Sequence, residues 1–466
     1  MKKLLLLALL AGCTTVGPDY RRPDVVPLPG EYPAQFPDGA ATQSEAVAPD
    51  WWRLYQDATL EELVESGRKT NADLRQATAR VQEAEGVLRE TNAAYFPEVN
   101  AGYAYQRAGV STVAQPPVPN GISVIRPSHT LTASTSFEID FWGKFARASE
   151  SARAALLASR YSRDVVEMTL ASAIAQSYFA LRSLDAQVAV LDASIRVRQD
   201  SLEIARARLK SGLASELDVY QAEGALADAL VQRRDAQRAR GLVEHQLAQL
   251  TGRLDLRLAA GDLFALPLPP LPPPGLPSAL LERRPDIRQA EEALVAQNAL
   301  IGVARAQMFP TISLTASAGA QSAELGDILT RSASIWTIGA NITAPIFDAG
   351  RRQARVDQAT ARREQAVAGY QRAIESGFRE VADALVNVRE TGDSEAELAR
   401  RLDAARKALA LSQVRYESGY SPYLEVLDAQ RTANDAELAF VRNRQARLAF
   451  SVDLMKALGG GWVAYR

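Results

Sequence analysis

The stretch "YESGYSPYLEVLDAQ" (residues 416–430) closely resembles an earlier stretch, "LKSGLASELDVYQAE" (residues 209–223), with every position shifted by the same amount. Further upstream, "DIRQA" at 286–290 matches "DLRQA" at 73–77. The shift there is slightly larger because the first copy carries a longer, Pro-rich loop between its halves. A repeat of this length predicts that one structural unit occurs twice in the chain.

The repeat divides the 466 residues into five segments. We predict a signal peptide at 1–12, a lipidated extended segment at 13–56, repeat one at 57–263, a linker at 264–277 and repeat two at 278–466. The linker reads "FALPLPPLPPPGLP", which is typical of extended polyproline. With 47% apolar and 23% charged residues, the chain has the composition of a large folded protein.

The first residues have the pattern of a secretory signal, with a basic pair, a short apolar run and then small residues. The run ends at Leu10-Ala11-Gly12-Cys13, which resembles the bacterial lipobox, where the cysteine is acylated after cleavage. Cys13 is the only cysteine, so a chance cysteine here would be a free thiol in an oxidising compartment. Thr14 follows it, and by resemblance to lipoprotein sorting this residue favours the outer membrane over the inner one.

Each repeat is expected to begin with a short helix, followed by a second helix that ends at Phe-Pro. In repeat one, Thr59 and Glu62 have the spacing of a capping box. The periodicity then changes to the alternation of strands, each about as long as a tilted membrane strand. The four predicted strands are at ~98–107, ~130–142, ~311–320 and ~334–346.

A long helix without proline follows each strand pair, at 144–211 and at 351–418. Apolar residues in both recur with the alternating spacing of a coiled-coil seam. In the first copy the seam is Leu170, Ile174, Ser177, Leu181, Leu184, Val188, Leu191 and Ile195, and in the second it includes Val381, Ala384, Val388, Leu398, Leu402 and Leu409. Ser-Gly then ends each helix, and a return helix is expected from Ser215 or Ser421. The stretches 211–217 and 418–424 are therefore predicted to be the tips of two helical hairpins.

Four strands per chain cannot close a barrel, and a membrane tolerates no open sheet edge. The chain is therefore expected to oligomerise: two copies would give eight strands and a filled interior, whereas three would give twelve and a lumen. Small residues suit the lumen face: Gly102, Ala104, Gly339 and Asn341. Bulky apolar residues suit the lipid face: Tyr103, Tyr105, Phe137, Ile139, Phe141, Trp336, Ile338 and Ile342. A soluble β-sandwich is the alternative that the strands alone leave open.

The sequence carries no recognisable catalytic or cofactor motif. His129 and His245 lack the neighbouring ligands that a metal site needs, no phosphate-binding glycine loop is present, and we expect no cofactor, no metal and no enzymatic activity. The net charge of −2 provides no basic surface for nucleic acid, so no nucleic-acid partner is expected.

Several motifs in order resemble the TolC-like outer membrane factors, in particular their NodT-type lipoprotein branch. They are "GPDYRRP" (17–23), "FEIDFWGK" (137–144), "SYFALRSLDAQ" (177–187), "RRPDIRQAE" (283–291), "FPTISL" (309–314), "APIFDAGR" (344–351) and "YLEVLDAQR" (423–431). The resemblance implies an α+β membrane protein: a homotrimer whose twelve-stranded transmembrane β-barrel, four strands from each chain, continues into a long antiparallel coiled-coil barrel of α-helices. It also implies docking, through a periplasmic adaptor, onto an inner-membrane pump, with the RND type expected.

The candidate functional residues lie at the hairpin tips. Leu424 and Asp428 are four residues apart and share a helix face, so threefold symmetry would form rings of leucines and of carboxylates. By resemblance they form the periplasmic constriction, and Arg415 with Tyr416 forms a polar latch between neighbouring hairpins. Repeat one has Gln221 in place of Asp428, so only the second hairpin would supply acidic groups. The candidates for adaptor contact are the turn residues Gly212, Leu213, Gly419 and Tyr420, although ordinary hairpin geometry would also explain the glycines.

These features together predict the exit duct of a tripartite efflux pump, anchored by lipid on Cys13 to the outer membrane of a Gram-negative bacterium. Transport through it would be passive and gated at the tips. Two alternatives remain at this stage: a type I secretion duct, and a periplasmic lipoprotein that forms no pore. The four amphipathic strands argue against the second alternative, and the sequence does not indicate the cargo.

Overall fold

The chain folds into two compact units, and the computed structural model describes residues 15–24, 47–111, 123–270 and 280–462. Cys13 and linker residues 271–277 lie outside these ranges. The sheet-bearing unit comprises the described parts of Met1–Pro23, Val81–Ala158 and Ala290–Tyr370. The helical unit comprises the described parts of Asp24–Arg80, Ser159–Gln289 and Gln371–Arg466. Both repeats contribute to each unit.

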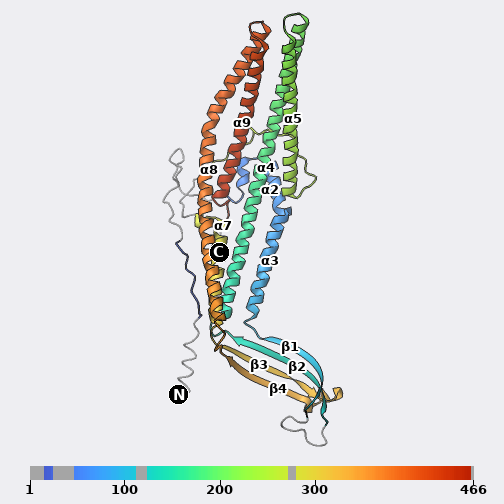
Figure 1. The fold of residues 1–466 in the computed structure, drawn as a ribbon, viewed down its shortest axis with the longest axis vertical. Coiled ribbons are helices and arrows are strands. Elements are labelled where there is room, and N and C mark those ends of the chain that lie inside the picture. Colours follow the sequence, from blue (N-terminus) through green and yellow to red (C-terminus); the bar gives the residue numbers. More distant parts are fainter. Residues whose placement is uncertain (1–14, 25–46, 112–122, 271–279, 463–466) are drawn as a thin grey trace. The chain divides into compact units, whose positions relative to one another are not determined.

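The sheet-bearing unit contains one four-stranded antiparallel sheet, in the order β1-β2-β3-β4 (Figure 1). Its strands are β1 (Glu98–Gly109), β2 (Ile125–Ile139), β3 (Thr311–Ser322) and β4 (Ser334–Thr343). Strand β2 of repeat one pairs with β3 of repeat two, so the two repeats share one sheet. Within the described residues, β1 and β4 each have a single neighbouring strand.

All four predicted strands are confirmed, but two of them end earlier than expected. Strand β2 stops at Ile139 because Asp140 turns to accept a hydrogen bond from the backbone N–H of Ala146 (2.9 Å), in the first turn of the following helix. Phe141 therefore lies outside the strand in which it was placed. Strand β4 stops at Thr343, since Pro345 has no N–H to donate to a ladder.

The register gives the sheet one apolar and one polar face. Tyr103 pairs with Leu131, and Leu131 with Ala320, so these residues lie on the same face. The apolar face also carries the predicted lipid-facing residues within the strands: Tyr105, Phe137, Ile139, Trp336, Ile338 and Ile342. The opposite face carries Gly102, Ala104, Gly339 and Asn341, together with a series of serines and threonines. The predicted division between the two faces is confirmed for the strand residues.

Two helical hairpins, formed by α4 with α5 and by α8 with α9, contain the longest elements (Figure 1). Their bounds are α4 (Lys144–Lys210), α5 (Glu216–Thr251), α8 (Arg351–Glu417) and α9 (Tyr423–Ala457). The shorter elements are η1 (Trp51–Tyr55), α2 (Ala58–Thr70), α3 (Ala72–Ala93), α6 (Leu280–Arg283), α7 (Pro285–Ala306), η3 (Leu325–Asp327) and η4 (Arg331–Ala333). No helix in the described part of the chain is long and apolar enough to cross a membrane.

The predicted capping box of the first helix is wrong. Helix α2 begins at Ala58, and its N-cap is Asp57, whose carboxylate accepts a hydrogen bond from the backbone N–H of Leu60 (2.8 Å). Thr59 and Glu62 therefore both lie inside the helix. Asp57 also accepts a hydrogen bond from the hydroxyl of Tyr178 (2.8 Å), and this tertiary contact favours the earlier start.

Most of the predicted coiled-coil seam of α4 is buried in the helical unit, while Leu184 and Val188 are half-buried. Leu170, Ile174, Leu181, Leu191 and Ile195 are all less than one-tenth exposed. Four of the bulky side chains that pack around its first half come from η1, just before repeat one, and from α2 at its start: Trp51, Tyr55, Leu60 and Leu63. The same core contains Val441, Leu448, Val452 and Met455 of repeat two, so it joins both repeats. The hydroxyl of Tyr55 also bonds that of Ser451 in repeat two (2.7 Å).

Equivalent residues of the two repeats hold the ends of the return helices. The side-chain amide of Asn71 donates to the backbone carbonyl of Leu250 (3.0 Å), and Arg284 donates to that of Ala457 (3.0 Å). Arg284 also forms ion pairs with Asp286 and with Glu380 on α8. The side chain that donates to the last turn of the return helix is therefore a neutral amide in repeat one and a charged guanidinium in repeat two.

Candidate functional site

Both hairpin tips are built on the same turn. Gly212 (φ 72°) and Gly419 (φ 78°) take the left-handed conformation that ends a helix without steric strain. The residue after each glycine donates back to the helix: Leu213 N to Arg208 O and Tyr420 N to Arg415 O, both at 2.8 Å. These paired bonds explain the repeated Ser-Gly.

The second return helix starts one residue later than predicted. Pro422 is its N-cap and Tyr423 its first helical residue, so Ser421 is not the cap. Proline at this place has no N–H that would need a partner, and no side-chain cap replaces it. In the first hairpin the cap is Ser215, as predicted.

A small apolar core closes the space between the two tips in the helical unit. It consists of Leu202, Ala205, Val219, Ala222, Tyr416, Tyr423 and Val426. The rings of Tyr416 and Tyr423 lie 5.4 Å apart between centroids, and both side chains are buried. Their hydroxyl groups have no hydrogen-bond partner among the described residues. Burial raises the pKa of Tyr423 to about 12 and also raises the pKa of Tyr416.

Arg208 links the first tip to the second. Its guanidinium lies 4.9 Å from the centre of the Tyr416 ring and donates to the Tyr416 carbonyl (2.9 Å). Arg415, the equivalent residue of the second copy, instead bonds Glu425 of its own hairpin (3.0 Å), and both partners are largely exposed. Of the two predicted latch residues, Tyr416 thus contacts the neighbouring hairpin of the same chain, while Arg415 faces solvent.

Leu424 and Asp428 lie on the exposed side of α9. Leu424 is 60% exposed, although it is a large apolar side chain. The carboxylate of Asp428 pairs with Arg431 at 2.8 Å, one turn further on. Sequence reasoning missed Arg431, although its spacing from Asp428 is that of a helical ion pair. Repeat one has Gln221 and Gly224 at the equivalent positions, so it lacks both members of the pair.

The predicted contact residues of the turns are exposed on the helical unit. Leu213 is 69% and Tyr420 81% exposed, and Leu217 and Tyr220 of the first hairpin are exposed as well. Apolar side chains at this exposure are costly in water unless they meet a partner. The tips therefore present an apolar contact surface.

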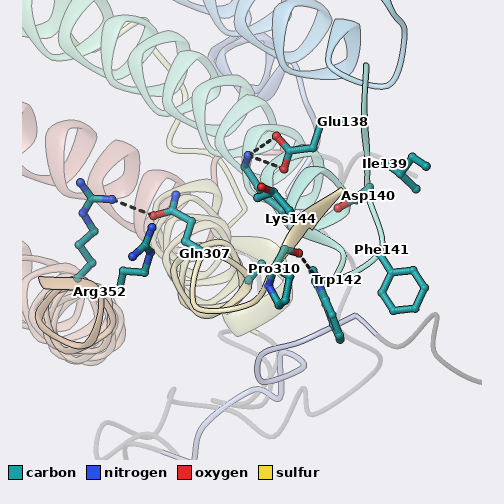
Figure 2. A pocket seen from close by; sticks show the side chains of 12 residues that line it. Glu138, Ile139, Asp140, Phe141, Trp142, Lys144, Gln307, Pro310 and Arg352 are labelled. Carbon is teal, nitrogen blue, oxygen red and sulfur yellow. Dashed lines mark hydrogen bonds and ion pairs between the residues drawn. The ribbon is translucent and has the colours of Figure 1, made fainter. Parts of the chain in front are cut away.

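A second candidate site is the pocket of about 190 Å³ where the sheet meets the start of α4 (Figure 2). Lys144 bonds both carboxylate oxygens of Glu138 at 3.0 Å, and Arg355 donates to the side-chain carbonyl of Gln307 (3.2 Å). The indole N–H of Trp142 donates to the carbonyl of Pro310 (2.7 Å). The cations of this pocket are thus engaged in local contacts, which suits a structural joint between strand and helix.

The N-terminal strap, residues 15–24, runs along the sheet-bearing unit beside this pocket. Val16 N donates to the Trp142 carbonyl (3.1 Å), and Asp19 pairs with Arg147 (2.6 Å). Gly17 passes so close to Gly302 that a Cβ on Gly17 would lie 2.5 Å from the Gly302 Cα. Two further contacts hold the strap: the Asn298 amide donates to the Pro18 carbonyl (2.9 Å), and Arg22 pairs with Glu291 near the far end (2.6 Å). These contacts give Gly17, Pro18, Asp19 and Arg22 of the motif "GPDYRRP" a structural role.

The two histidines lie apart from the tips. His129 is on β2, where its Nδ1 bonds the hydroxyl of Tyr103 (2.8 Å), and His245 is exposed on α5. Among the described residues, no three His, Cys, Asp or Glu side chains are grouped closely enough to hold a metal ion.

Comparison with known proteins identifies a family model that matches both repeats. The model for "Outer membrane efflux protein" matches residues 63–253 and 276–460. The "Solvent efflux pump outer membrane protein SrpC" of Pseudomonas putida is 33% identical over 469 residues, covering 98% of this chain and 97% of that protein. The "Cation efflux system protein CusC" of Escherichia coli O157:H7 is 32% identical over 466 residues, covering 97% and 96%.

Solved structures match the chain over almost its whole length. A crystal structure of CusC superposes with a TM-score of 0.86 at 31% identity, covering 96% of this chain and all of that one. The outer-membrane channel OprN superposes with a TM-score of 0.87 at 28% identity, with the same coverage. The paired repeats, the shared sheet and the long hairpins are thus the fold of these channels.

Proposed function

The chain belongs to the outer membrane efflux protein family and is an outer membrane efflux channel, and from this premise we propose that it acts as a homotrimer. The observation that carries the proposal is the sheet. In the described part of the chain it has an apolar face, which suits lipid, and two unpaired edges, β1 and β4, which a membrane does not tolerate. Pairing β4 of one copy with β1 of the next closes twelve strands around a lumen.

The polar face then lines the lumen and the apolar face meets lipid. Serine, threonine and glycine on the inner face leave a wide, weakly selective passage. Transport through it is passive, and no enzymatic step is required. The relatives carry names for solvents, toluene, antibiotics and cations, so the cargo is expected to be chosen by the pump.

The tips are proposed to dock a periplasmic adaptor, which joins the channel to an inner-membrane pump of the RND type. The exposed apolar side chains of Leu213 and Tyr420 support this contact. An adaptor that buries them removes apolar surface from water at both turns of each chain. A type I secretion system would use the same tips. Co-purification of the channel with its inner-membrane partner distinguishes an RND-type pump from a type I secretion system.

The periplasmic gate is proposed to be formed by Leu424 and Asp428 on α9. Both side chains are exposed in the single chain, so they are available to contact the equivalent residues of the other two copies across a pore. Because Asp428 pairs with Arg431, the ring would alternate acidic and basic groups and would carry little net charge. The leucine ring would exclude water in the closed state.

Lipid on Cys13 is proposed to anchor the mature N-terminus, through a diacylglyceryl thioether on the sulfur and an acyl amide on the amine. The strap supports this, since it holds Thr15 and Val16 beside Gly143 and Trp142, at the end of the sheet. Several buried acyl chains, at about 0.8 kcal/mol per CH₂, give firm attachment. Mass spectrometry of the N-terminal peptide checks this, and an unmodified Cys13 would contradict it.

The experiment that tests the channel is conductance of the purified protein in a planar bilayer. We expect discrete openings, which become more frequent when Leu424→Ser removes the apolar ring. Leu217→Ser is the matched control, because Leu217 is the equivalent residue of repeat one and lacks the neighbouring ion pair. A protein that inserts into the bilayer but conducts in neither form would favour a spacer without a pore.

A further inference from the structure

The apolar face of the sheet is hollow at its centre. Two adjacent rows of paired residues cross it: Val99, Thr135, Ala316 and Ile338, then Ala101, Ala133, Ala318 and Trp336. In both rows the residues on the central strands β2 and β3 are small. They line a depression of about 380 Å³ whose surface is almost entirely apolar.

Larger side chains border this hollow on several sides, while Ala101 and Ala320 leave it open at one corner each. Val99 stands on the β1 side, and Trp336 with Ile338 on the β4 side. Along the strands it is bounded by Leu131 at one end and by Leu314 at the other, each in the next row. Because the hollow lies on β2 and β3, edge pairing of β1 and β4 with other copies leaves it open on the lipid face.

A narrow, flexible and apolar group fits such a hollow. A depression on a lipid-facing surface must be filled, since empty space forfeits the dispersion contacts of its lining. Side chains of the same sheet do not fill it, because alanine and threonine project too little. The end of an acyl chain has the required width and chemistry.

The N-terminal strap places one source of acyl chains beside the sheet. Val16 N donates to the Trp142 carbonyl (3.1 Å). The Thr15 side chain packs on Gly143 so closely that a Cβ added to Gly143 would lie 2.6 Å from the methyl carbon of Thr15. The ion pair of Asp19 with Arg147 holds the strap in this position. Cys13 precedes Thr15 by two residues in the sequence, and two residues span at most about 7 Å of chain.

The hollow is within the reach of an acyl chain that starts near this point. Thr135 lies four residues, or about 13 Å of extended strand at 3.3 Å per residue, before the end of β2 at Ile139, and a turn of three further residues leads to Trp142. A lipid tail spans half of the hydrocarbon core, about 15 Å. Added to the reach of about 7 Å from Thr15 to Cys13, this length brings the end of the chain to the first row of the hollow.

We propose that one acyl chain on Cys13 lies along the apolar face of its own subunit and ends in the hollow formed by Thr135, Ala316, Ala133 and Ala318. This inference rests on the proposed lipid modification of Cys13. The lipid then has two roles: it anchors the N-terminus, and it completes the outer surface of the sheet. The alternative occupant is a free lipid of the bilayer.

The test uses the protein in its own membrane. Cells are grown with a palmitic acid that carries a diazirine near its methyl end, the membranes are irradiated, and the purified protein is digested for mass spectrometry. We expect peptides containing residues 131–137 or 314–318 to be cross-linked to the acylated N-terminal peptide. Ala316→Phe fills the hollow and is expected to remove these cross-links. Ala340→Phe, on the same face but outside the hollow, is expected to keep them.

Each outcome of this experiment bears on a different claim. If the N-terminal peptide is acylated but these strands are cross-linked only to free phospholipid, the docking proposal is overturned and the lipid anchor stands. If the cross-links persist unchanged in Ala316→Phe, the hollow is not the binding site. If Cys13 carries no acyl group, both the anchor and the docking proposal fail.

Discussion

Arg284 joins three elements of the helical unit, and its removal has a predictable cost. Its guanidinium bonds the carboxylate of Asp286 (3.0 and 2.7 Å), Glu380 on α8 (2.7 Å) and the Ala457 carbonyl on α9 (3.0 Å). Only 2% of the residue is exposed. We predict that Arg284→Met, which keeps an apolar stem, lowers the free energy of unfolding by about 3 kcal/mol.

The magnitude follows from what each partner loses. The Ala457 carbonyl loses a donor in a buried place, which costs about 1–3 kcal/mol. The side chains of Asp286 and Glu380 are 28% and 40% exposed, so water replaces part of the interaction and each lost pair costs at most about 1 kcal/mol. Burial by itself would lower the pKa of Arg284, but its two carboxylate partners outweigh burial and raise the pKa, so the group stays charged.

The assay is urea unfolding of the detergent-solubilised protein, followed by circular dichroism of the helices. The control is Arg379→Met on α8, because the pair of Arg379 with Asp383 (2.9 Å) is largely exposed and its loss should change stability by less than about 0.5 kcal/mol. We expect Arg284→Met to lower the urea midpoint and Arg379→Met to leave it nearly unchanged. Equal midpoints for the two variants would refute the reasoning that burial gives this contact its weight.

Three further predictions concern the tips and the strap. Arg431→Ala leaves Asp428 without its partner, so bilayer recordings should show a higher preference for cations, and Asp428→Asn in the same background should abolish that gain. Because burial raises the pKa of Tyr423 to about 12, folding keeps this hydroxyl protonated; its contribution to stability is full below pH ~10 and is lost as pH rises toward 12. Tyr423→Phe should therefore show a smaller fall in unfolding midpoint over that range than the wild type. Finally, Gly302→Val should displace the strap, because a Cβ there lies 2.8 Å from the Val16 carbonyl oxygen, and limited proteolysis near the N-terminus should become faster.

The local pattern of the sequence predicted the elements well, because hydrophobic period and turn chemistry act over a few residues. The long helices, the Ser-Gly turns and the two faces of the sheet all follow from such patterns. The errors arose at element ends. Asp57 rather than Thr59 caps α2, since Tyr178 binds its carboxylate from another helix, and β2 ends at Ile139, since Asp140 is needed as a cap for α4.

What the sequence by itself determined is the duplication, the order of elements in each copy and the chemical character of each strand face. The tertiary structure decided which residues meet across the duplication: Arg208 of the first tip with Tyr416 of the second, β2 with β3, and the strap with Trp142. It also showed that two rows of small residues align into a hollow. Such contacts join residues far apart in the chain, and their register depends on how whole elements pack. A pattern of spacing along one element does not contain that information.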